Sequence, residues 1–207
     1  MKFNKDMLSL YAVTDRTYLK GKSLTEAVEQ AIQSGVTCVQ LREKNISFDE
    51  YVSRAKKICE VCHKYGVPLI INDDYRVALD SGADGVHVGI EDTEVAEIRK
   101  HVSGNFIIGA TAKTVKQAQK AQADGADYLG VGAVFPSPTK TNAIRITPEK
   151  LTQICNSVDI PVVAIGGISL ENLHEIKDCG QSGIAVVSAL FAQEDIRLSA
   201  EHLRTKL

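Results

Sequence analysis

Residues 81–86 read Ser81-Gly-Ala-Asp-Gly-Val86, and this short passage recurs with changes at two other places in the chain. The related passages are residues 123–128 (Ala-Asp-Gly-Ala-Asp-Tyr) and residues 179–184 (Cys-Gly-Gln-Ser-Gly-Ile). In each, a segment of helical periodicity ends near a glycine, which is a common C-cap, and an apolar run starts soon afterwards. The passages therefore predict a chain that repeats one unit, a helix leading into a strand.

Working outward from these passages, short apolar runs alternate with longer segments of helical periodicity along the whole chain. The expected strands are Leu8–Val13, Cys38–Leu41, Pro68–Ile71, Gly85–Val88, Phe106–Gly109, Tyr128–Val131, Pro161–Ala164 and Ile184–Val187. The expected helices are Leu24–Gln33, Phe48–Lys64, Arg76–Asp80, Glu94–His101, Val115–Ala123, Pro148–Asn156, Leu170–Lys177 and Asp195–Thr205.

Eight strand-then-helix units without a break in composition predict parallel strands joined by crossover helices, and eight such units can close into a barrel. At 207 residues the chain would be one compact (β/α)8 TIM barrel of the phosphate-binding type, spanning residues 1–207. This is shorter than the roughly 250 residues typical of that fold. An open doubly wound sheet is the alternative. No strand-to-helix passage reads G-x-G-x-x-G, so dinucleotide binding has no support.

The composition is that of an ordinary globular protein, with 44% apolar and 24% charged residues and a formal charge of -2. There is no long run of Lys or Arg, which argues against nucleic acid or an anionic membrane as a partner. No segment reaches the roughly 20 apolar residues that span a bilayer, and the first ten residues do not resemble a secretory signal. We therefore expect a cytoplasmic protein that binds small anions locally.

The five cysteines are odd in number, and we expect free, mostly buried thiols in a reducing compartment, without a disulfide. Residues 59–63 spell the C-x-x-C-H signature of covalent haem attachment. However, Ala55, Ile58, Cys59 and Cys62 recur at the spacing of an amphipathic helix. The buried stripe of a helix is the better interpretation of this motif.

Active sites of barrel enzymes lie at the C-terminal ends of the strands. After the second expected strand, alternation would direct Gln40, Arg42 and Lys44 to one side of the strand. An amide and two cations at this spacing suit an elongated polyanion such as a diphosphate. A solvated, salt-bridged strand end is the alternative.

The next two strands end in carboxylates, at Asp73 and Asp74 after one and at Asp92 after the other. Oxygen ligands on adjacent loops suit Mg²⁺, which takes one or two carboxylates and completes its shell with water and substrate phosphate. We expect Asp74 to cap the following helix instead. No His or Cys pair at a strand end favours zinc.

The last two strands end in residues 164–169 (Ala-Ile-Gly-Gly-Ile-Ser) and 186–189 (Val-Val-Ser-Ala). Glycines there let backbone N–H groups approach an anion, as in the phosphate-binding loops of many barrel enzymes, although a tight turn would also need them. The long polar segment 135–143 is expected to form a lid. Two anion sites predict two phosphorylated substrates.

His87 is the one candidate proton carrier, and a packed or hydrogen-bonded role is the preferred alternative.

Together these residues resemble the thiamin phosphate synthase family. The similarity runs in order through nearly the whole chain, and its Gln-x-Arg-x-Lys, Asn-Asp and Lys140 features are more selective than its glycines. The matching segments are Leu10–Asp15, Val39–Lys44, Ile71–Asp74, Ala83–Gly89 with Glu91–Asp92, Gly132–Pro136 with Thr139–Lys140, Ile165–Ile168 and Val187–Ala189.

The resemblance implies an enzyme that joins 4-amino-2-methyl-5-hydroxymethylpyrimidine diphosphate to a thiazole phosphate, or its carboxylated form, and releases diphosphate. It assigns the catalytic cations to Arg42, Lys44 and Lys140, and Mg²⁺ to Asp73 and Asp92. It also implies a substrate-binding set, with the diphosphate on Gln40 and Asn72, the pyrimidine near Thr111, and the thiazole phosphate on the remaining members: Ser137, Thr139, Gly166, Gly167, Val187 and Ser188.

The family often has serine where this chain has Thr111, and the segment after Lys140 is shorter than in some relatives. Two other functions remain open at this stage. A thiazole tautomerase on the same barrel would keep the phosphate site without needing a diphosphate–Mg²⁺ site. A non-catalytic barrel that binds a phosphorylated ligand would show binding without turnover.

Overall fold

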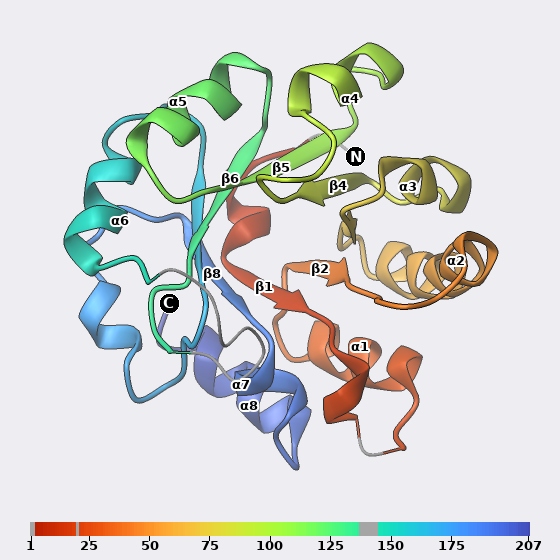
Figure 1. The fold of residues 1–207 in the computed structure, drawn as a ribbon. Coiled ribbons are helices and arrows are strands. Elements are labelled where there is room, and N and C mark those ends of the chain that lie inside the picture. The colour runs from red at the N-terminus through yellow and green to blue at the C-terminus, as the bar shows by residue number, and fades with distance from the viewer. Residues whose placement is uncertain (1–2, 20, 137–144) are drawn as a thin grey trace.

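The computed structural model describes residues 3–19, 21–136 and 145–207. Its centre is a closed barrel of eight parallel strands that are neighbours in chain order, with the last strand paired to the first. Figure 1 shows the helices arranged around these strands. The predicted (β/α)8 barrel is thus confirmed.

The strands have nearly the predicted positions. Their bounds are β1 Leu10–Val13, β2 Cys38–Leu41, β3 Leu69–Asn72, β4 Gly85–Val88, β5 Ile107–Ala112, β6 Tyr128–Gly132, β7 Val162–Ile165 and β8 Gly183–Val186.

The helices occupy the connections between strands. Their bounds are α1 Leu24–Gln33, α2 Phe48–Lys64, α3 Tyr75–Ser81, α4 Val95–His101, α5 Val115–Ala123, α6 Pro148–Cys155, α7 Ser188–Phe191 and α8 Ile196–Arg204, with 3-10 turns η1 Lys5–Leu8, η2 Arg16–Tyr18 and η3 Leu173–Ile176. Among the residues the structure describes, no helix has the length and apolar character needed to cross a membrane.

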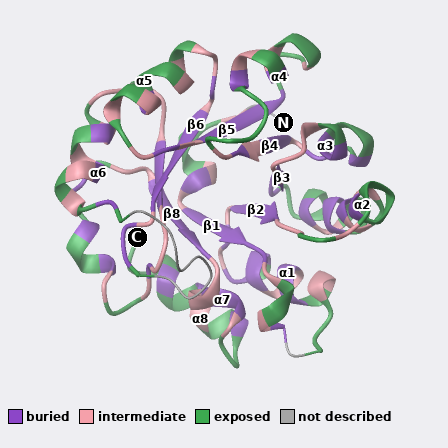
Figure 2. Ribbon diagram, in the orientation of Figure 1, coloured by how far each residue is buried: buried purple, intermediate pink, exposed green. Residues whose placement is uncertain are grey.

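Alternation along each strand divides the apolar residues between two cores. One lies between the strands and the surrounding helices and includes Leu10, Val39 and Ile71. The other fills the barrel interior, with Tyr11 and Tyr128 among its members. Figure 2 shows the result, with buried strands at the centre and helices whose outer faces are exposed.

Sequence signals at helix starts are used as expected. Ser23 and Ser47 accept hydrogen bonds from the backbone N–H groups of Glu26 and Glu50, and Asp74 accepts one from Arg76 at the start of α3. Each cap satisfies a backbone donor that has no acceptor inside its helix. The predicted capping role of Asp74 is confirmed.

The predicted first strand begins too early, because Leu8 belongs to the 3-10 turn η1. This turn carries the chain to the barrel wall, where the side chain of Leu8 joins the interior core. A Cβ added to Gly183 would lie only 1.9 Å from the carbonyl oxygen of Leu8. Glycine at the start of β8 therefore permits this close approach of the two backbones.

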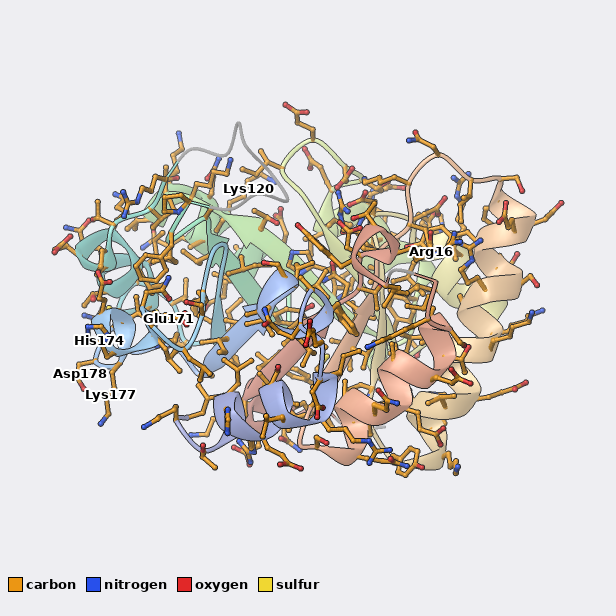
Figure 3. All side chains as sticks on the ribbon, turned by 90° about the horizontal axis from the view of Figure 1, so that it is seen from below. Arg16, Lys120, Glu171, His174, Lys177 and Asp178 are labelled. Atoms are coloured by element: carbon orange, nitrogen blue, oxygen red, sulfur yellow. The ribbon has the colours of Figure 1, made fainter. Side chains whose placement is uncertain are left out.

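The predicted helix Leu170–Lys177 is wrong, since only η3 forms there. The amide of Asn172 binds the preceding loop instead, accepting from the N–H of Ser169 at 2.9 Å and donating to the carbonyl of Gly167 at 2.8 Å. Such local side-chain bonds compete with helix formation. Figure 3 shows that the labelled residues of this connection, Glu171, His174, Lys177 and Asp178, lie on its outer surface.

Candidate active site

A pocket lies among the C-terminal ends of the strands, as expected of a barrel enzyme. Its walls come from residues that alternation directs inward, including the cation Lys113, and from the loops after β7 and β8. Eight of the residues predicted from the sequence line this pocket: Gln40, Arg42, Asn72, Thr111, Gly166, Gly167, Val187 and Ser188.

The end of β2 contributes a neutral donor and a cation. Gln40 is buried, and its amide donates to the hydroxyl of Tyr11 at 3.0 Å. One guanidinium nitrogen of Arg42 lies 3.6 Å from a carboxylate oxygen of Asp15. The next residue, Glu43, faces α2 and forms an ion pair with Arg54 at 2.7 Å. Alternation along the strand therefore directs Gln40 and Arg42 toward the pocket and directs Glu43 toward α2, where it pairs with Arg54.

Carboxylates and a lysine form the rim beside this pocket. The ammonium of Lys44 lies 2.6 Å from a carboxylate oxygen of Asp73. Asp73 has a left-handed backbone with φ of +69°, which aspartate adopts more readily than most residues. The carboxylate of Asp92 accepts from the N–H of Gly89 at 2.7 Å. Lys44, Asp73 and Asp92 thus meet at the rim, outside the residues that line the pocket.

Burial is the main cause that raises the pKa of Asp92, and the neighbouring carboxylate of Asp73 raises it further. Two neighbouring carboxylates form a donor set that a divalent cation stabilises. Within the described residues there is no cluster of three or more His, Cys, Asp or Glu placed to hold a metal. The pair fits the mode in which Mg²⁺ takes few protein ligands and shares its shell with substrate phosphate.

The loops after β7 and β8 form the opposite side of the pocket. Gly166 and Gly167 have φ of +99° and +64°, in the left-handed region that favours glycine. A Cβ on Gly167 would lie 2.2 Å from the carbonyl oxygen of Pro136, so the site needs glycine for space as well. After β8, helix α7 starts at Ser188, where backbone N–H groups have no acceptor within the helix. These features suit an anion.

Three predicted residues, Ser137, Thr139 and Lys140, lie outside the described residues, as does most of the expected lid. The segment leading to them is held against the loop after β7. The N–H groups of Val134 and Phe135 donate to the carbonyls of Ile165 and Gly166 at 3.0 and 2.9 Å. The connection after β6 therefore leaves the barrel directly beside the two glycines.

A line of five hydrogen-bonded polar side chains crosses the barrel along the inner end of the pocket, and we refer to it as the interior chain. It consists of Gln40, Tyr11, Tyr128, His87 and Thr111. Sequence reasoning missed both tyrosines. A tyrosine within a fully buried strand was the available signal, because a buried hydroxyl needs a hydrogen-bond partner.

His87 has the hydrogen-bonded role that was the preferred interpretation. Its Nδ1 is 3.1 Å from the hydroxyl of Tyr128, and its Nε2 is 3.1 Å from the hydroxyl of Thr111. Burial lowers the pKa of His87 from 6.5 to about 4, opposed by the charge of Asp73. The imidazole is therefore neutral at physiological pH.

This pKa predicts how stability responds to acid. An unfolded histidine binds a proton near pH 6.5 and the folded one only near pH 4, so stability is lost as the pH falls through this interval. The loss due to His87 is at most about 3 kcal/mol. Urea unfolding at pH 7.0 and pH 4.5 measures it. In His87→Gln the difference between the two pH values should shrink, and an unchanged difference would contradict the assignment.

Gly109 and Gly130 make room for the interior chain, and Gly109 is the more closely surrounded of the two. A Cβ on Gly109 would lie 2.1 Å from the ring of Tyr128 and 2.5 Å from Nδ1 of His87. We expect Gly109→Ala to lower the free energy of unfolding by about 1–3 kcal/mol, because overpacking forces buried side chains out of place. Denaturant unfolding measures the loss. Gly104→Ala is the matched control, since a Cβ there meets nothing within 4 Å. Equal stabilities of the two variants would refute the argument.

The C-x-x-C-H motif lies on α2 and away from this pocket. Cys59 and Cys62 are buried together with Ala55 and Ile58 in the core between helix and barrel. Burial raises the pKa of Cys59 to about 11 and that of Cys62 further, so both thiols are protonated. All five cysteines are free in the structure. The helical-stripe interpretation is confirmed.

Comparisons with known proteins identify the family of this chain. The model of the thiamine monophosphate synthase family matches residues 10–190. A thiamine-phosphate synthase of Ruminiclostridium cellulolyticum is 50% identical over 94% of this chain and 93% of its own length. One from Clostridium tetani is 46% identical over 97% of this chain and 96% of its own.

Solved structures give the same result. The thiamine phosphate pyrophosphorylase from Pyrococcus furiosus superposes with a TM-score of 0.89 at 39% identity, covering 97% of this chain and 96% of that one. A 3-hexulose-6-phosphate synthase, at 16% identity and a TM-score of 0.70, shares the fold. Since the family model spans most of the chain and these relatives match it over nearly their full length, the chain belongs to the thiamine monophosphate synthase family.

Proposed function

We propose that this barrel joins 4-amino-2-methyl-5-hydroxymethylpyrimidine diphosphate to a thiazole phosphate, forming thiamin phosphate and diphosphate. Family membership makes the chain a transferase of thiamine biosynthesis, with thiamine-phosphate synthase activity. The observation that carries the detailed proposal is the pairing of a cationic end and a glycine-lined end within one pocket. These two ends suit the two phosphorylated groups of the substrates.

The diphosphate is proposed to lie over the ends of β2 and β3. Arg42 offers a planar, permanently charged fork that matches phosphate oxygens, and the amides of Gln40 and Asn72 offer neutral donors. In the present structure the ammonium of Lys44 is paired with Asp73. Half-exposed ion pairs of this kind are weak, so Lys44 can turn to the diphosphate when it binds. Lys140 is assigned to the same group by resemblance to the family.

Asp73 and Asp92 are proposed to hold Mg²⁺ together with the diphosphate. The pairing of their carboxylates, expressed in the raised pKa of Asp92, supports this assignment. A bound Mg²⁺ would neutralise negative charge on the departing diphosphate. Once Lys44 turns to the diphosphate, the carboxylate of Asp73 at the rim is free to take the metal.

The thiazole phosphate is proposed to bind the glycine-lined end. Gly166, Gly167, Val187 and Ser188 lie together at the pocket wall, and Asn172 holds the carbonyl of Gly167. With that carbonyl engaged, the loop can present its N–H groups to an anion. Ser137 and Thr139 are assigned to this phosphate by resemblance. The pyrimidine would then lie between the two ends, close to Thr111.

The reaction requires stabilisation of charge more than proton transfer. The thiazole nitrogen is already a nucleophile, and the bond that breaks joins the pyrimidine CH2 carbon to a diphosphate oxygen. Negative charge develops on that oxygen, and preorganised donors in a site that excludes water stabilise it. His87 accepts or donates a hydrogen bond at both ring nitrogens and needs no role as a base. We infer a carbocation-like pyrimidine intermediate.

The first experiment mixes the purified protein with both phosphorylated substrates, with Mg²⁺ or with excess chelator, and follows products by chromatography. We expect equal amounts of thiamin phosphate and diphosphate, and only when Mg²⁺ is present. Absence of product from folded protein that still binds the thiazole phosphate would refute the proposal and support the tautomerase or the non-catalytic alternative. Isomerisation of the thiazole would then be measured directly.

The proposed partners are these small molecules, with no nucleic acid or membrane involved. A cytoplasmic location is proposed because the cysteines are free thiols, as expected in a reducing compartment.

A further inference from the structure

The interior chain connects side chains from five strands. The amide nitrogen of Gln40 on β2 is 3.0 Å from the hydroxyl of Tyr11 on β1, and that hydroxyl is 2.8 Å from the hydroxyl of Tyr128 on β6. The chain continues through His87 on β4 to Thr111 on β5, with two contacts of 3.1 Å. Both of its ends line the pocket. The chain is therefore a continuous polar connection between two predicted substrate-binding residues.

The chemistry of these groups gives the chain a direction. The amide nitrogen of Gln40 can only donate, so the oxygen of Tyr11 accepts from it, and we assign the proton of Tyr11 to the nearby hydroxyl oxygen of Tyr128. In this assignment Tyr128 donates to Nδ1 of His87. A neutral imidazole has one N–H, which is then on Nε2 and is donated to the hydroxyl oxygen of Thr111. The proton of Thr111 is left unused by the chain.

The barrel is shaped around this arrangement. Gly109 and Gly130 face the chain, and a Cβ on Gly130 would lie 2.8 Å from the ring of His87. Tyr128 is fully buried and does not line the pocket. It cannot touch a substrate, and burial raises its pKa well above 10, so it keeps its proton. Any effect of Tyr128 on the reaction must pass through its two hydrogen-bond partners, His87 on one side and Tyr11 on the other.

We propose that the interior chain holds His87 as the Nε2–H tautomer and thereby keeps the hydroxyl of Thr111 a hydrogen-bond donor toward the pyrimidine diphosphate. Tyr128 is then a positioning residue. When the hydroxyl of Tyr128 is removed, His87 can carry its proton on Nδ1 and accept a hydrogen bond from Thr111 at Nε2. The threonine proton is then turned away from the substrate. The choice of substrate rests on the proposed function, whereas the tautomer of His87 can be measured without any substrate.

The first test is a pair of double-mutant cycles. Tyr128→Phe should lower kcat about tenfold while KM changes by less than about threefold, the loss of one hydrogen bond felt mainly in the transition state. In a Thr111→Ser background, which keeps the hydroxyl, the same loss is expected. In a Thr111→Val background it should shrink below about twofold, because the group on which Tyr128 acts is gone. An equal loss in the two backgrounds would overturn the proposal.

The second test needs no substrate, and its decisive measurement is made on the wild-type protein. The ring ¹⁵N shifts of His87, assigned by comparison with His87→Gln, report its tautomer. We expect a protonated Nε2 and an unprotonated Nδ1 at pH 7, and a shift toward Nδ1–H in Tyr128→Phe if that variant folds. A wild-type protein with Nδ1 protonated refutes the chain direction. An inactive wild type with Nε2–H contradicts the proposed function alone and leaves the chain supported.

Discussion

Arg42→Ala is expected to lower kcat by about 10² or more, the largest effect of any single side-chain truncation at this site. Arg42 lines the pocket at the end of β2. Its backbone N–H donates to the hydroxyl of Thr14 at 3.0 Å. Asp15 lies 3.6 Å from one of its nitrogens and orients it. Charge that develops on the departing diphosphate would lose a preorganised donor. Steady-state kinetics with both substrates measures the loss, and Lys140→Ala should behave similarly.

Two variants separate position from charge. Arg42→Lys keeps the charge but lacks the planar fork, so its kcat should lie between those of the wild type and Arg42→Ala. Arg16→Ala removes a cation on η2 that is half exposed, lies 3.8 Å from Glu43 and is not among the residues that line the pocket. Its kcat should stay within about twofold of the wild type, because exposed pairs contribute little. Unchanged turnover in Arg42→Ala would remove Arg42 from the mechanism.

Asp92→Asn is expected to raise the Mg²⁺ concentration needed for half-maximal turnover by at least about tenfold, since it removes one of the two carboxylates that we propose as Mg²⁺ ligands. The neutral amide can still accept from the N–H of Gly89, so the loop should keep its shape. Saturating Mg²⁺ should therefore restore part of the activity. A titration of initial rate against Mg²⁺, at saturating substrates, measures the shift.

Asp74→Asn is the matched control, because it removes the same charge one residue away from Asp73. The carboxylate of Asp74 caps α3 and pairs with Arg76 at 2.8 Å, so its loss should affect stability and leave the Mg²⁺ requirement unchanged. If Asp92→Asn and Asp74→Asn give the same Mg²⁺ curve as the wild type, the proposed metal site is wrong.

Much of the site follows from local sequence. Alternation along a strand is a local property, so it places Gln40 and Arg42 toward the pocket and Glu43 toward α2. Glycine caps and polar strand ends are equally local signals. The failure at Leu170–Lys177 is instructive, because Asn172 reaches back to the loop that carries Gly167, a contact that apolar periodicity does not reveal.

The sequence by itself determined the alternation of strands with helical connections and the strand ends at which the candidate site lies, since each depends on periodicity within short segments, and it left an open sheet as the alternative to the barrel. Only the tertiary structure decided that Tyr11 and Tyr128 meet, although 117 positions separate them. It also decided that Lys44 pairs with Asp73 and that Asp92 lies beside them. The physical reason is closure of the barrel. The register of all eight strands sets which inward side chains face one another, and no single segment encodes that register.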